Sequence, residues 1–205
     1  VQPDAQGGPL ARVSSSMWTL SRTPFFRLMH TATCLCFLAG GVLASHATED
    51  EILGHALLCL VCYAMHFKCA HMNTGRLENG PRPQCSICLK STPGFDHHCI
   101  FLHKCVGTAN YPTFIMMTWL HVAGCCSTGW LTIRALLLDA DWTSSYSVRG
   151  VPSPPTTMVV LRYLTRIYPL SVISALLSVT LGLALTGFGL FHTHRLYKRY
   201  TTKQS

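Results

Sequence analysis

Residues Tyr111–Ile133 read YPTFIMMTWLHVAGCCSTGWLTI and contain no Asp, Glu, Lys or Arg. A membrane-spanning helix needs about 20 apolar residues, so this stretch is long enough to cross a bilayer. Three more charge-poor stretches lie before and after it: Leu28–Thr48, the shorter Ile52–Phe67, and Ile167–Thr193. The chain of 205 residues is 49% hydrophobic and only 12% charged, about half the charged fraction of a typical soluble domain. We therefore expect an all-α membrane protein with four transmembrane helices.

Positive charge is distributed unevenly around these stretches. Twelve of the sixteen Lys and Arg residues fall in the N-terminal tail, in the loop between the second and third stretches, or after the fourth: Arg12, Arg22, Arg27, Lys68, Arg76, Arg82, Lys90, Lys104, Arg195, Lys198, Arg199 and Lys203. The first short loop instead carries three acids, Glu49-Asp50-Glu51. Because cytosolic loops are enriched in Lys and Arg, we expect both termini and the middle loop to be cytosolic.

Four arginines disagree with this orientation: Arg134, Arg149, Arg162 and Arg166. A helix at the far membrane surface, over Thr156–Tyr168, would hold the last two. The predicted organisation is a cytosolic tail (1–27), spans one and two (28–67), a cytosolic cysteine-rich loop (68–110), spans three and four with their lumenal loop (111–193), and a cytosolic tail (194–205). Residues 1–24 and 143–157, rich in Ser, Pro, Gly or Thr, are expected to form a loose tail and a lumenal loop, respectively. A cleaved signal peptide ending near Ala44-Ser45 is the alternative for the first stretch.

The middle loop concentrates groups that carry chemistry. Cys85 and Cys88 form a C-x2-C pair, the usual first half of a zinc knuckle. Asp96-His97-His98-Cys99 follows, and an acid, an imidazole and a thiol are the components of an activated nucleophile. Because a reducing cytosol disfavours disulfides, these thiols are best interpreted as metal ligands or nucleophiles.

Two ligand sets fit the spacing of this loop. If Cys99 is a ligand, Cys85, Cys88, Cys99 and Cys105 form a structural four-cysteine zinc site and no nucleophile remains. If His98 is the ligand, the site is Cys85, Cys88, His98 and Cys105, and Cys99 stays free beside His97. Spacing by itself does not choose between them.

A resemblance to a known family bears on this choice. The pattern Asp96-His97-His98-Cys99, then Cys105-Val106-Gly107, Asn110 and Phe114, resembles the DHHC family of protein S-acyltransferases (palmitoyltransferases). That family has four spans with this domain in the cytosolic loop between the second and third. The resemblance implies that Asp96, His97 and Cys99 are the catalytic acid, base and nucleophile. It also implies one zinc ion, held by Cys85, Cys88, His98 and Cys105.

Several positions depart from the family pattern. The family's other zinc site falls on His71, Thr74, Gln84 and Ser91, where none of the expected ligands is present. Ile100-Phe101 replaces the usual Pro-Trp after the catalytic cysteine, leaving an apolar wall without the indole donor. Lys104 replaces Asn, and Thr201-Thr202-Lys203-Gln204 carries Gln in place of the Glu of Thr-Thr-x-Glu.

The resemblance implies a protein S-palmitoyltransferase of an endomembrane, the ER or Golgi. Its co-substrate would be palmitoyl-CoA or a similar long-chain acyl-CoA, and its acceptors cysteine-containing proteins at the membrane. The net charge of +8 fits the topology and anionic lipid headgroups, with no pattern suggesting nucleic acid. The alternatives are a catalytically inactive DHHC-like scaffold or regulator, and a zinc-loop membrane adaptor in which Cys99 is a ligand.

Overall fold

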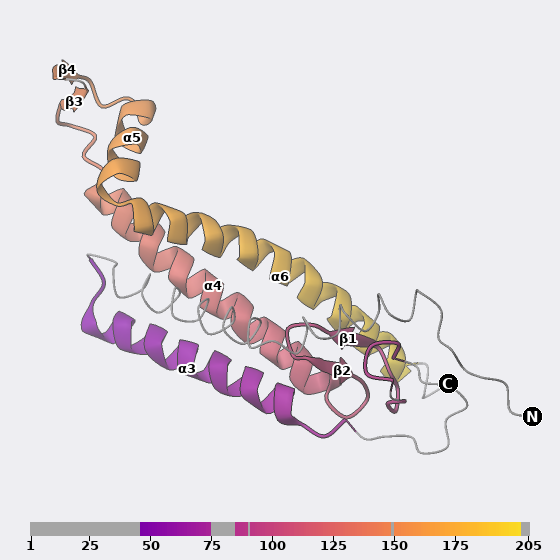
Figure 1. The fold of residues 1–205 in the computed structure, drawn as a ribbon. Coiled ribbons are helices and arrows are strands. Elements are labelled where there is room, and N and C mark those ends of the chain that lie inside the picture. Colours follow the sequence, from indigo (N-terminus) through magenta and orange to yellow (C-terminus); the bar gives the residue numbers. More distant parts are fainter. Residues whose placement is uncertain (1–45, 75–84, 90, 149, 202–205) are drawn as a thin grey trace, which may run out of the picture. The chain divides into compact units, whose positions relative to one another are not determined.

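The computed structural model describes residues 46–74, 85–89, 91–148 and 150–201. Three long helices dominate this part of the chain: α3 (Glu49–His71), α4 (Tyr111–Asp139) and α6 (Pro169–Thr201) (Figure 1). A hairpin of β1 (His97–Cys99) and β2 (Lys104–Val106) precedes α4. A second hairpin, β3 (Tyr146–Val148) and β4 (Val151–Ser153), and the short helix α5 (Thr157–Ile167) separate α4 from α6. Residues 28–45 of the first predicted span and the Thr202–Gln204 segment lie outside the described residues.

Each long helix is long and apolar enough to cross a membrane. The second predicted stretch, Ile52–Phe67, is extended at both ends into a 23-residue helix. The predicted start of the fourth span is wrong, because Ile167 ends α5 and α6 begins at Pro169. A residue before proline is driven out of the helical region, and Tyr168 has φ −121° and ψ 53°.

The helix α4 packs antiparallel to both of the other long helices. Toward α3, His55 bonds Ser127 (Nδ1 to Oγ, 2.9 Å), and the thiol of Cys62 donates to the carbonyl of Leu120 (3.1 Å). Toward α6, the indole N–H of Trp119 donates to Thr193 Oγ1 (3.1 Å). Glycines lie where these helices meet: Gly124 is beside Cys62, Gly182 beside Cys125, and Gly189 beside Trp119. Small residues at such contacts let helix backbones approach closely, as in membrane bundles.

Large apolar side chains point outward from these helices. Leu60 is 62% exposed, Trp130 64% and Leu183 71%, whereas Thr128, Thr132 and Ser178 are buried between helices. A soluble protein rarely exposes so much contiguous apolar surface. This exposed apolar surface is suited to contact with the hydrocarbon core of a bilayer.

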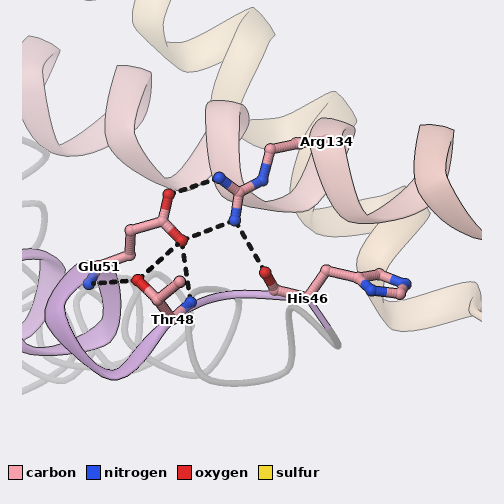
Figure 2. A network of polar contacts seen from close by, with 4 residues as sticks. All are labelled: His46, Thr48, Glu51 and Arg134. Carbon is pink, nitrogen blue, oxygen red and sulfur yellow. Dashed lines mark hydrogen bonds and ion pairs between the residues drawn. The ribbon is translucent and has the colours of Figure 1, made fainter.

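A capping box begins α3. The Thr48 backbone N–H donates to Glu51 Oε2 (2.9 Å), and the Glu51 N–H donates to Thr48 Oγ1 (3.3 Å). These bonds satisfy amide groups that a helix N-terminus leaves without partners. Figure 2 shows the same Glu51 carboxylate paired with Arg134 of α4, which also donates to the His46 carbonyl.

The segment predicted as a loop over residues 143–157 contains a short hairpin. The strands β3 and β4 pair there in antiparallel register, with Tyr146 opposite Ser153. Gly150 has φ +80° in the turn, a conformation that glycine adopts without steric cost. The predicted helix over Thr156–Tyr168 is present as α5.

Candidate active site and metal centre

The β1–β2 hairpin sorts the reactive residues onto two faces. Its register pairs His97 with Val106, His98 with Cys105, and Cys99 with Lys104. Successive side chains on a strand point to opposite faces, and directly paired residues share a face. His98 and Cys105 therefore lie on one face of the hairpin, and His97 and Cys99 on the other.

Four possible metal ligands gather on the first face. One ligand atom from each of Cys85, Cys88, His98 and Cys105 lies within 4.8 Å of all the others. From His98 Nδ1 the sulfur atoms are 3.1 Å (Cys88), 3.7 Å (Cys85) and 3.8 Å (Cys105) away. Ligands on a tetrahedral zinc ion lie roughly 3.3–3.8 Å apart, so the cluster has the dimensions and donor types that zinc prefers. Cys99 is not a member of it.

The turn that carries Cys85 and Cys88 is shaped as a knuckle. The backbone N–H of Cys88 donates to Cys85 Sγ (3.3 Å), and that of Leu89 donates to the Cys85 carbonyl (3.0 Å). Leu89 has φ 52°, in the left-handed region. This turn brings both sulfur atoms to one side.

Electrostatics in the cluster favour a cation. Burial, reinforced by hydrogen bonds with the thiols of Cys85 and Cys88, raises the pKa of Cys105 to about 12. Burial also lowers the pKa of His98, and the neighbouring His103 and His97 lower it further. Thiolates crowded this closely repel one another, whereas a divalent cation would hold them ionised.

Asp96 and His97 form a hydrogen-bonded pair. His97 Nδ1 lies 2.8 Å from Asp96 Oδ2, and the carboxyl side chain is fully buried. An ionised carboxylate can only accept, so it fixes the proton on Nδ1 and leaves Nε2 as a proton acceptor. The His97 ring also meets Phe114 edge-on, with centroids 5.3 Å apart.

Cys99 ends β1, and the turn that follows points amide groups at its sulfur. The side chain is 7% exposed, and burial raises the pKa of the Cys99 thiol. The backbone N–H groups of Leu102 and Phe101 act in the opposite direction by hydrogen-bonding the sulfur. The turn closes with the His103 N–H donating to the Ile100 carbonyl (3.3 Å), and His103 has φ 50°. These amides would stabilise a thiolate.

Residues 83–205 match the model of the DHHC palmitoyltransferase family. The chain belongs to this family. Probable protein S-acyltransferase 7 of Arabidopsis thaliana is 29% identical over 104 residues, 47% of this chain and 22% of that protein. Human palmitoyltransferase ZDHHC3 is 28% identical over 103 residues (46% and 29%), and palmitoyltransferase pfa3 of Aspergillus fumigatus is 28% identical over 127 (60% and 20%). The aligned regions thus cover less than a third of each relative's length.

The DHHC family pattern after the hairpin has a packing reason. Asn110 is fully buried; it accepts a hydrogen bond from the Gly107 N–H (2.8 Å) and donates one to the Cys105 carbonyl (3.1 Å). A Cβ at Gly107 would lie 2.7 Å from the Pro93 carbonyl oxygen and 2.8 Å from Thr92 Cγ2. Asn110 therefore fastens the second strand to the start of α4, where only glycine fits at position 107.

Lys104, where the DHHC family usually has Asn, has a contact that the sequence did not indicate. Its Nζ donates to the Met72 carbonyl (2.5 Å), directly after the C-terminal end of α3. A cation is favourable at a helix C-terminus. The strand opposite Cys99 is thereby tied to the end of a span helix.

Two other departures from the DHHC pattern are visible. Ile100 and Phe101, in place of Pro-Trp, are 46% and 65% exposed. The ring of His71 stacks on Phe67 (centroids 4.0 Å apart), and its Nδ1–H donates to the Phe67 carbonyl (2.8 Å). His71 is thus engaged within its own helix, and Gln84 lies outside the described residues.

Proposed function

We propose that this chain is a protein S-acyltransferase that moves a long-chain acyl group from acyl-CoA to protein cysteines through Cys99. One observation carries the proposal: the four-residue cluster contains His98 and excludes Cys99, and Cys99 shares the opposite strand face with His97. Family membership supports the reaction class, and the three apolar helices support a position in a membrane, where acyl chains reside.

The chemistry proceeds in two exchanges. His97 Nε2 accepts the Cys99 thiol proton while Asp96 holds the ring in the required tautomer. The thiolate attacks the thioester carbonyl, an acyl–Cys99 bond forms, the bond to CoA sulfur breaks, and the CoA thiolate takes the proton from His97. An acceptor thiol then loses its proton to His97 and attacks acyl–Cys99, and Cys99 leaves as the thiol after regaining that proton.

A single zinc ion on Cys85, Cys88, His98 and Cys105 would fix the hairpin in shape and take no part in these steps. The charge distribution supports a cytosolic position for this loop and both termini, where acyl-CoA is available. An ER or Golgi membrane is the proposed location.

A second candidate is an inactive DHHC-like scaffold. The exposed Ile100 and Phe101 in place of Pro-Trp, and the missing ligands of the other zinc site, favour it. The hydrogen-bonded Asp96–His97 pair, whose histidine shares a strand face with Cys99, favours the enzyme, because a scaffold has no physical need for it.

Labelling of the purified full chain with a clickable palmitoyl-CoA analogue separates the two. The enzyme gains a label that hydroxylamine removes, because hydroxylamine cleaves thioesters. If the wild-type chain binds zinc but takes up no label, the enzyme proposal is contradicted and the inactive scaffold remains as the candidate function.

A further inference from the structure

The segment between α4 and α6 gathers aromatic side chains. Trp142 is 49% exposed and Tyr163 37% exposed, and the rings of Tyr146 and Tyr163 meet with centroids 4.9 Å apart. Tyr168 lies at the junction of α5 and α6. Trp and Tyr concentrate at the level of lipid headgroups, so this composition is typical of a membrane–water interface.

The helix α5 has an apolar face wider than the part that protein covers. Val160 and Leu164 are buried, in a cluster with Leu136, Ala140, Tyr146, Tyr168 and Val172. On either side of this contact, Met158 is 59% exposed, Leu161 50% and Ile167 50%. Residues three and four apart lie on one side of a helix, so Met158 and Leu161 form one exposed apolar edge, and Ile167 lies on the other.

Two cations occupy the remaining face. Arg162 and Arg166 are four residues apart and exposed, opposite the face that packs on protein. The described part of α5 contains no acidic residue to pair with them. An exposed apolar edge beside a basic face is the pattern of a helix that lies in the plane of a bilayer surface.

The direction of α5 relative to α6 also fits a helix that lies along the membrane surface. Pro169 breaks the helix, so that α5 turns away from the axis of α6 (Figure 1). The first turns of α6 expose Leu170 (66%) and Ile173 (53%). Apolar side chains are therefore exposed on both sides of the break, in α5 and in the first turns of α6.

We propose that α5 is an interfacial helix embedded in the headgroup layer of the bilayer, at the surface where α4 ends and α6 begins. Met158, Leu161 and Ile167 enter the acyl-chain region, and Arg162 and Arg166 bind lipid phosphates. The occupant of this surface is the bilayer in which the chain resides. The proposal is independent of acyl transfer.

Photocrosslinking in phosphatidylcholine vesicles tests it. The full chain carries a benzoylphenylalanine at position 161 or, as the matched control, at Val151 in the β3–β4 turn region, which is 62% exposed. After irradiation and proteolysis, mass spectrometry should find lipid adducts at position 161 several-fold above those at 151. Equal yields, no lipid adduct at 161, or a crosslink to a second protein copy would overturn the bilayer as occupant.

A second arm tests the phosphate contacts. With the label at position 161, Arg162→Gln combined with Arg166→Gln should lower the lipid adduct yield several-fold in phosphatidylcholine and in phosphatidylglycerol vesicles, while Lys at both positions should retain it. Both sites are exposed, so an unchanged melting temperature verifies folding. A yield unaffected by the Gln pair, or lowered in phosphatidylglycerol alone, would overturn binding to the phosphate shared by both lipids.

Discussion

Arg134 and Glu51 form a two-pronged ion pair that joins α4 to the first turn of α3, with N–O distances of 2.5 Å and 2.6 Å (Figure 2). Arg134 is one of the four arginines that disagree with the predicted orientation. Its charge is matched by the carboxylate of Glu51. The same carboxylate caps α3, so one side chain serves two contacts.

The pair predicts coupled effects on stability. Glu51→Gln should lower the melting temperature, because it leaves the Arg134 guanidinium without its counter-charge and weakens the α3 cap. Arg134→Met should also lower it. The double variant should lose less than the sum of the two, since both changes remove the same interaction. Thermal unfolding in detergent measures this, with the exposed Glu49→Gln as the control. Strict additivity would contradict the coupling.

Autoacylation is expected at Cys99. Cys99→Ser should reduce the hydroxylamine-labile label to background, because a neutral hydroxyl is a far weaker nucleophile than a thiolate. Cys125→Ser, at a buried thiol of α4, should keep the wild-type label. Label that persists in Cys99→Ser would place the acyl group on another residue.

The Asp96–His97 pair predicts a tautomer effect on the rate. An amide at position 96 can donate to Nδ1, which moves the ring proton to Nε2 and removes the acceptor that Cys99 needs. Asp96→Asn should therefore slow autoacylation by roughly 10²- to 10⁴-fold. Asp139→Asn is the matched control, because Asp139 also bonds a histidine, His46, at 2.7 Å. Equal rates in the two variants would remove the proposed role of Asp96.

One zinc per chain is expected by elemental analysis. Substitution of Cys85, Cys88, His98 or Cys105 by Ala should lower the zinc content and destabilise the loop, because metal affinity at such sites is folding free energy. Cys99→Ala should keep the metal.

Two outcomes would contradict this ligand set. Two zinc ions per chain would show that the family's other zinc site is present after all, on residues other than those assigned above. Loss of zinc in Cys99→Ala with retention in His98→Ala would make all four ligands cysteines, which fits an adaptor in place of an enzyme.

Topology is tested by glycosylation mapping. An acceptor sequence inserted near Glu49 should be glycosylated, and one near Asn79 should remain unmodified, because the charge distribution predicts a lumenal position for the first only. Modification near Asn79 would separate Cys99 from cytosolic acyl-CoA and end the transferase proposal.

Composition and spacing determined much of this protein without a structure. The length of the charge-poor stretches predicted the three described long helices. A helix that crosses a bilayer needs about 20 apolar residues, and their order within the stretch matters little. The C-x2-C pair predicted the knuckle, since two thiols at that spacing need only a local turn. The break at Pro169 could have been read from the sequence too, from the proline alone.

Contacts between distant residues were decided only by the tertiary structure. Four consecutive residues, Asp96 to Cys99, do not show which side chains will share a face until β1 pairs with β2. The register then groups His98 with Cys105 and turns Cys99 the other way, because side chains alternate along a strand. In the same way, the partner of Arg134 lies 83 positions away, and only the antiparallel packing of α3 and α4 brings the two charges together.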